Sequence, residues 1–158
     1  MRIEPIAAHP GRIANLAAWH HAQWSHLYDD WTLEVAMGEL RDHASRAGIP
    51  TTLLLLDGDS LLGSVSIVLE DAPALQFLGG PWLASLYVVP EARGRGLGKR
   101  LVQAAVRLAA ENQVPQLLLF TPEHGDFYRR LGWREFRRAE LLGTPVDVMA
   151  IEPRSLAA

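Results

Sequence analysis

The sequence predicts a single mixed α/β domain built around one central sheet. The length of 158 residues is that of one ordinary domain. Hydrophobic residues make up 49% of the chain and charged residues 21%, which is enough apolar material for a core. Strand-type and helix-type segments alternate, and no internal repeat is visible. We therefore expect one domain over residues 1–158.

Hydrophobic spacing and the residues at segment ends define the predicted elements. Thr32 is a suitable N-cap for the second helix, and Gly48-Ile49-Pro50 ends it. Asp57-Gly58-Asp59 lies between two apolar runs and indicates a β-hairpin, and Gly132 is a suitable C-cap. In chain order we expect a strand at 2–6, helices at 11–27 and 33–47, strands at 51–56, 61–69 and 82–89, a helix from 97, a strand at 116–120, a helix at 123–131, and strands at 133–138 and 146–151.

Charge and composition exclude several functional classes. Fifteen Lys and Arg against 18 Asp and Glu give a net charge of -3, which disfavours a nucleic-acid-binding protein. The chain has no cysteine, so thiol nucleophiles and Cys-based zinc sites are absent. Glu4 and Pro5 interrupt the start where an export signal needs an apolar run, and no stretch of about 18 apolar residues occurs. We expect a cytoplasmic protein that binds neither nucleic acid nor membrane.

Residues 86–100 are the most informative segment. A strand ends at Pro90, and glycines at 94, 96 and 98 then open an amphipathic helix. The first N–H groups of a helix lack partners within it and lie at the positive end of its dipole, which favours phosphate oxygens. Four basic residues add positive charge: Arg93, Arg95, Lys99 and Arg100.

Two common phosphate-binding motifs do not fit this turn. The NTPase loop needs glycine at 93 and Ser or Thr at 100, where Arg93 and Arg100 stand. The dinucleotide fingerprint needs glycine at 99 or 101, where Lys99 and Leu101 stand. A helix entry that merely needs flexible residues is the non-functional alternative.

Arg93, Gly96 and Gly98 instead form the pattern R-x-x-G-x-G, and here the chain resembles the GCN5-related N-acetyltransferases (GNAT superfamily). In that family the motif holds the pyrophosphate of acetyl-CoA, so the resemblance implies coenzyme A binding at about residues 82–131. It also implies a mixed, mostly antiparallel sheet of about seven strands, flanked by about four helices and splayed between strands four and five. The implied cofactor-binding residues are Leu86, Tyr87, Val88, Arg93, Gly94, Arg95, Gly96, Leu97, Gly98, Lys99, Thr121 and Phe127.

The segment from Phe127 to Trp133 is similar to the family's F-Y-x-x-L-G-F/W motif. The resemblance implies that Tyr128 protonates the departing thiolate, and a phenol of pKa about 10 is suited to this. The alternative is an interfacial tyrosine with a packed ring and a solvated hydroxyl. Thr121 stands where many members carry an asparagine that contacts the pantetheine arm, and its hydroxyl would have to replace that amide.

The acceptor amine must lose a proton, so we expect its site to contain a base or a water relay. Family members bind the acceptor over the first two helices (about 11–47) and the loop before strand four. His20 lies on the apolar face of the first helix and His21 off it, and packing is the alternative role for both. The four tryptophans at 19, 24, 31 and 82 would either wall a pocket or fill the core. Two acidic residues, Glu70 and Asp71, stand at the end of the third strand. The acceptor-site candidates are His20, His21, Trp24, Glu70, Trp82 and Ser85.

These observations together predict an acetyl-CoA-dependent N-acetyltransferase without a covalent enzyme intermediate or a metal. Its acceptor would be an amine of a small molecule or a peptide N-terminus. The alternatives are a non-catalytic acyl-CoA-binding module and an acyltransferase with another donor, such as succinyl-CoA. An exposed last strand near residues 146–151 would support a homodimer.

Overall fold

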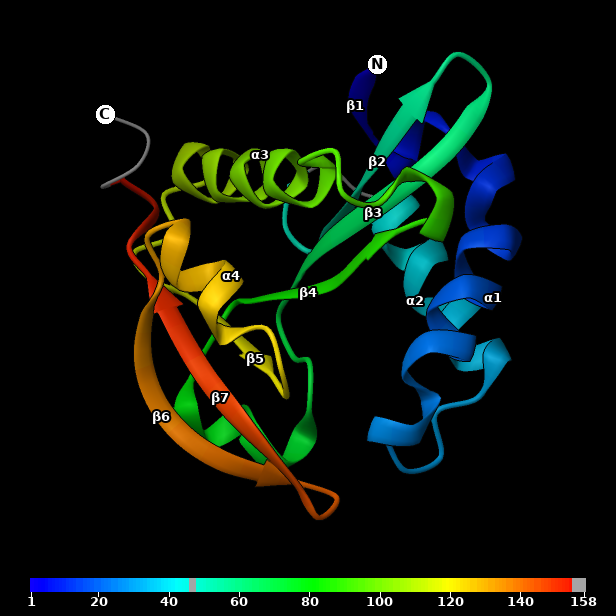
Figure 1. Ribbon diagram of the computed structural model, residues 1–158. Helices are drawn as coiled ribbons and strands as arrows, with labels where there is room; N and C mark the ends of the chain where they lie inside the picture. The colour runs from blue at the N-terminus through cyan, green and yellow to red at the C-terminus, as the bar shows by residue number, and fades with distance from the viewer. Residues whose placement is uncertain (46–47, 155–158) are drawn as a thin grey trace.

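The computed structural model describes residues 1–45 and 48–154, so Ala47, predicted in the second helix, lies outside the described residues. Its seven-stranded sheet has the order β1-β2-β3-β4-β5-β7-β6 (Figure 1). Strands β4 and β5 are parallel, and every other neighbouring pair is antiparallel. This confirms the predicted mixed, mostly antiparallel sheet. The strands are β1 (Arg2–Pro5), β2 (Thr51–Asp57), β3 (Ser60–Val68), β4 (Trp82–Val88), β5 (Leu117–Thr121), β6 (Arg134–Leu141) and β7 (Thr144–Ile151).

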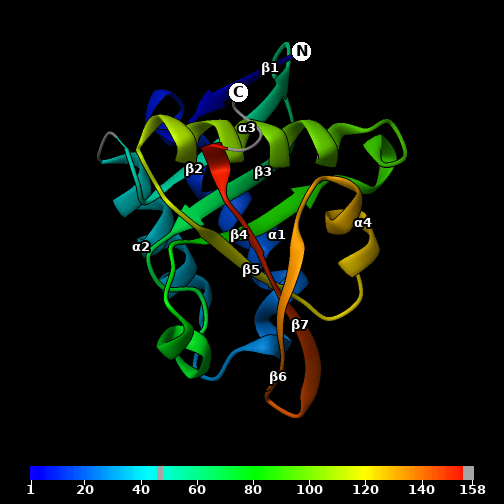
Figure 2. The ribbon, with the colours of Figure 1, turned by 90° about the vertical axis from the view of Figure 1, so that its left-hand side faces the viewer.

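The described residues contain four α-helices: α1 (Ile13–Trp24), α2 (Leu33–Ala44), α3 (Leu97–Glu111) and α4 (Gly125–Arg130). Helix α3 lies across one face of the sheet, and α1 and α2 cover the other (Figure 2). Thr32 caps α2 as predicted, because its hydroxyl accepts a hydrogen bond of 3.1 Å from the amide of Val35. None of the described helices has the length and apolar character that a membrane span requires.

Strand β2 is buried on both faces, which explains its uninterrupted apolar run. Leu55 packs under α3, whereas Leu54 and Leu56 pack under α1 and α2. Because alternate residues of a strand point to opposite faces, a strand between two helical layers needs apolar residues at every position. Each fully buried leucine contributes about 1.5–3 kcal/mol.

The sheet opens between β4 and β5. These strands share one register pair, Trp82 with Leu118, before they part. On the other side of β4, Ser64 pairs with Tyr87 and Ser66 with Ala84, so β4 carries an extra residue opposite β3. This bulge holds Ser85 at a φ of +56°, a left-handed conformation that is unusual for serine. The predicted separation of the fourth and fifth strands is therefore confirmed.

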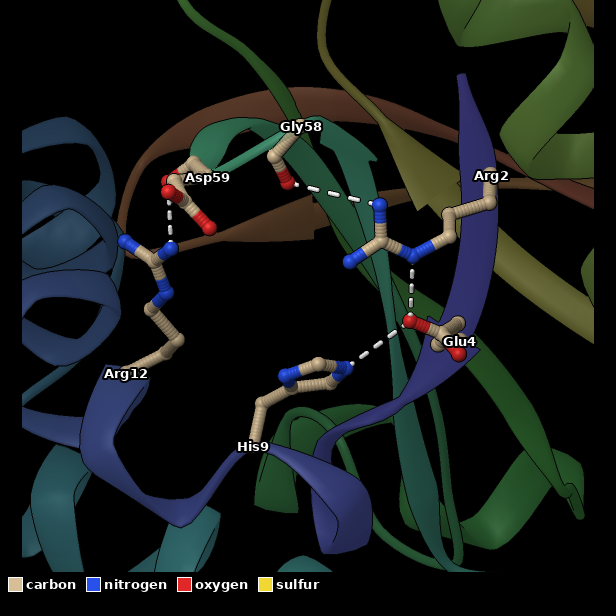
Figure 3. A network of polar contacts seen from close by, with 6 residues as sticks. All are labelled: Arg2, Glu4, His9, Arg12, Gly58 and Asp59. Atoms are coloured by element: carbon tan, nitrogen blue, oxygen red, sulfur yellow. Dashed lines mark hydrogen bonds and ion pairs between the residues drawn. The ribbon is translucent and has the colours of Figure 1, made fainter.

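A surface network fixes the start of the chain to the β2–β3 hairpin (Figure 3). Glu4 accepts hydrogen bonds from Arg2 (2.7 Å) and His9 (3.0 Å), which lower the pKa of its carboxyl. Arg2 also donates to the carbonyl of Gly58, and Arg12 donates to that of Asp59. All of these contacts except the half-buried one from His9 are exposed, so they set the position of β1 more than they stabilise the fold.

Gly63 of β3 allows β4 and α3 to approach closely. A Cβ at this position would lie 2.5 Å from the carbonyl oxygen of Tyr87 and 3.1 Å from a methyl of Leu101. We expect Gly63→Ala to lower the free energy of unfolding by about 1–3 kcal/mol, because the backbone would have to shift. Gly38→Ala in α2 is the matched control, since a Cβ there meets nothing within 4 Å. The control should gain about 0.5–1 kcal/mol. Urea unfolding measures both, and equal effects would contradict the prediction.

Candidate active site

A cavity of about 620 Å³ lies where β4 and β5 separate. Its walls come from α1 and α2 on one side, from β4 and β5 at the centre, and from the start of α3 and from α4 on the other. The cavity therefore joins the two regions to which the sequence assigned chemistry, the glycine-rich turn and the first two helices.

The glycine-rich turn forms one end of the cavity. Gly94 and Gly96 have φ values of +81° and +74°, which non-glycine residues rarely adopt. Gly96 is the N-cap of α3 and gives it no side-chain hydrogen bond, so the first amides of this 15-residue helix remain available to a ligand. All but one of the predicted residues of this segment line the cavity. The exception is Arg95, whose guanidinium points back to the carbonyl of Glu91 at 3.5 Å.

Strand β4 contributes Leu86, Tyr87 and Val88 to the cavity wall. Because β5 has already separated at this level, their backbone groups on that edge have no strand partner there. Arg93 donates to the carbonyl of Val88 at 2.8 Å, and its guanidinium lies 5.7 Å from the centre of the Tyr87 ring. This contact fixes the start of the glycine-rich turn to the end of β4.

Tyr128 lies on α4 and lines the cavity, although only 7% of its surface is exposed. Its ring packs against Phe127 and Trp133, with centroid distances of 5.0 and 5.9 Å. Burial raises the pKa of the phenol, so it stays protonated at neutral pH and can act as a donor. The hydroxyl of Thr121 accepts a 3.0 Å hydrogen bond from the amide of His124 and so shapes the turn before α4.

The acceptor-side candidates divide into two groups. His20, Trp24, Glu70 and Ser85 line the cavity, but His21 and Trp82 do not. His21 points away from the cavity-lining face of α1 and hydrogen-bonds the carbonyl of Trp31 at 3.0 Å. Trp82, at the start of β4, is fully buried in a core cluster with Leu118 and Val148.

Two buried histidines belong to polar chains beneath the sheet. His20 contacts the hydroxyl of Ser64 at 2.9 Å, and burial together with His43 lowers its pKa to about 3. His43 contacts Thr52, which contacts Ser66, at 2.8 Å in each case. A pKa near 3 is unfavourable for the general base that the sequence suggested at His20 and favours a structural role.

Four further residues form the far end of the cavity: Tyr28, Trp31, Glu39 and Asp71. The hydroxyl of Tyr28 donates to Asp71 at 2.8 Å, and the indole of Trp31 donates to Glu39 at 3.2 Å. The two rings pack at 5.3 Å. Burial raises the pKa of Asp71 to about 7, although the bond from Tyr28 opposes this shift. Sequence reasoning did not single out Tyr28 and Glu39. Glu39 had one signal, its place beside the buried α2 positions 36, 40 and 43.

The raised pKa of Asp71 predicts a particular pH dependence of stability. Between the ordinary value of 3.8 and about 7, the native Asp71 keeps a proton that the unfolded chain has released. Its contribution therefore lowers stability as pH rises through this window. His20 acts oppositely below pH 6.5, because its native pKa is lowered.

Asp71→Asn removes the pH-dependent contribution of Asp71 and leaves that of His20, and it retains an acceptor for Tyr28. We expect the stability of the variant, relative to the native protein, to increase from about pH 4 to pH 7 and then to level off. Urea unfolding at a series of pH values measures the difference. A difference independent of pH would contradict the assignment.

Comparisons with known proteins agree with this geometry. Residues 50–135 match the family model described as the acetyltransferase (GNAT) domain. No curated protein sequence matches the chain significantly.

Solved structures share the fold across nearly the whole chain. An aminoglycoside 6'-N-acetyltransferase complexed with coenzyme A is 18% identical, with 97% of each chain covered and a TM-score of 0.73. A spermidine N-acetyltransferase chimera of Vibrio cholerae SpeG and hSSAT is 14% identical, with 100% of each chain covered and a TM-score of 0.73. Arabidopsis thaliana NAA60 in complex with acetyl-CoA is 19% identical, with 96% of this chain and 97% of that chain covered and a TM-score of 0.68.

At these identities the solved structures establish the fold alone. The family model, however, matches more than half of the chain and spans the part that contains β4, β5, α3 and α4. The chain therefore belongs to the GNAT acetyltransferase family.

Proposed function

We propose that the protein is an N-acetyltransferase that uses acetyl-CoA and transfers the acetyl group directly to an amine of a small molecule or a peptide N-terminus. The observation that carries this proposal is one cavity lined both by the glycine-rich start of α3 and by the protonated phenol of Tyr128. A protein that only binds acyl-CoA has no need of a proton donor in the same cavity as its phosphate site.

The residues present suit coenzyme A. Free amides at the start of α3, the left-handed glycines and the positive charge of Lys99 match a pyrophosphate. Leu86, Tyr87 and Val88 offer backbone groups of the open β4 edge to the amides of a pantetheine arm. Thr121 and Phe127 line the same path. Acetyl-CoA supplies the activated acetyl thioester when it is bound.

Tyr128 would act at the end of the reaction. Direct transfer forms a C–N bond to the amine and breaks the C–S bond. The nitrogen then loses a proton to water, the departing sulfur gains one from the phenol, and the phenolate regains a proton from water, so the protons balance. The phenol is held protonated by burial, and the cavity in which it lies is bordered by β4 and β5. It can therefore donate that proton without a covalent enzyme intermediate.

We expect Tyr128→Phe to reduce kcat by about 10²-fold or more, because the variant loses a positioned acid. The dissociation constant for coenzyme A should stay within about twofold, since the ring that packs against Phe127 and Trp133 remains. Thiol release from acetyl-CoA measures the rate, and calorimetry measures binding. Full activity in the variant would contradict the acid role. Absence of thiol release from the native protein with every amine, despite coenzyme A binding, would favour a non-catalytic binding module.

Two substitutions on α3, compared with each other, test the proposed phosphate site. We expect Lys99→Gln to weaken coenzyme A binding about tenfold, because the variant loses a charge-assisted contact at the helix N-terminus. Arg107→Gln is the matched control, because Arg107 is an exposed cation on the same helix and does not line the cavity. Calorimetric titration compares the two variants. Equal weakening in both would indicate a general effect of charge and contradict a local site.

A further inference from the structure

The two ends of the cavity differ in charge. Arg93 and Lys99 line the end at the glycine-rich turn, whereas Glu39, Glu70 and Asp71 line the end formed by α2 and the segment after β3. Within residues 1–45 and 48–154, no Lys, Arg or His forms an ion pair with any of these three carboxylates.

We propose that the acceptor is a small dicationic amine, whose second, protonated amino group binds between the carboxylates of Glu39 and Asp71. The inference rests on the proposed function, because it assigns the other amino group to the acetyl transfer. It concerns the binding of the acceptor rather than the chemical step.

The two carboxylates are fixed in position by aromatic donors. Tyr28 donates to one oxygen of Asp71 and Trp31 donates to one oxygen of Glu39. Each carboxylate therefore keeps an oxygen that can accept a hydrogen bond from an ammonium group. The donors come from the segment between α1 and α2, so this segment positions both acids toward one space.

The same arrangement is electrostatically incomplete without a cation. Burial raises the pKa of both carboxyl groups, although Glu39 keeps much of its surface exposed, and the charge of Glu39 raises the pKa of Asp71 further. Charged groups in such a site are normally compensated by an opposite charge. An ammonium ion would favour the charged form of both acids at once.

The walls of this end also favour a cation on an aliphatic spacer. Trp24, Tyr28 and Trp31 line it, and aromatic faces attract ammonium groups while their edges pack against methylene groups. The cavity volume of about 620 Å³ is that of a small-molecule site. A neutral peptide N-terminus would leave both carboxylates without a partner, so the charge favours the small dication.

The experiment compares n-butylamine with 1,4-diaminobutane, which has the same carbon chain and a second amino group. At saturating acetyl-CoA we expect kcat/KM for the diamine to be at least about tenfold higher. Glu39→Gln and Asp71→Asn should each raise KM for the diamine about tenfold, with kcat and the monoamine kinetics within about twofold. Glu34→Gln, an exposed carboxylate on the same helix that does not line the cavity, should change neither amine.

Direct binding of both amines to the coenzyme A complex gives a readout that does not depend on turnover. Equal binding and equal use of the two amines would overturn the inference and leave an N-acetyltransferase. Selective diamine binding without acetylation would support the site and contradict the proposed function. Better use of a neutral peptide than of the diamine would also overturn the inference. Because Glu39 is exposed, its variant remains a fair test if the Asp71 variant folds poorly.

Discussion

The separation of β4 from β5 is the constraint on which the rest of the structure depends. One register pair keeps the sheet continuous, and the bulge at Ser85 then turns β4 away. Strand β5 keeps its position because five register pairs hold it to β7. The separation therefore leaves backbone groups of β4 without strand partners inside the domain, while β5 stays paired with β7. Buried backbone groups need partners, so a bound extended molecule would complete this edge.

The two ends of the opening carry opposite charges. The start of α3 supplies backbone donors and cations where β4 ends, and α2 with the segment after β3 supplies carboxylates at the other end. This separation would allow a chain of net charge -3 to hold the proposed polyanion and the proposed cation in one cavity. Tyr128 on α4 lines the same cavity, and burial raises the pKa of its phenol further above neutral pH.

Local signals predicted much of the fold and the residues that line one end of the cavity. Particular backbone conformations, which a few neighbouring residues specify, are required at the N-cap Thr32, at Gly94 and Gly96, and at the helix end Gly132. The end of the cavity lined by carboxylates could not be predicted in this way. Its Tyr28–Asp71 bond joins residues 43 positions apart, so only tertiary packing brings them together. The sequence left two roles open for Trp82, a pocket wall or the core, because a strand buried on both faces gives no alternation to read, and the structure places it in the core.

The buried histidine of α1 links the acceptor helices to the opening itself. Ser64 donates its hydroxyl hydrogen toward the carbonyl of Ser85, at 3.4 Å, so His20 donates to Ser64 through Nε2. The pKa of about 3 keeps this imidazole neutral at neutral pH, with its proton on Nε2. Helix α1 is therefore linked through Ser64 to Ser85, the residue with positive φ in the β4 bulge. The same helix carries Trp24 into the cavity wall, so one element both supports the open sheet and lines the proposed acceptor end.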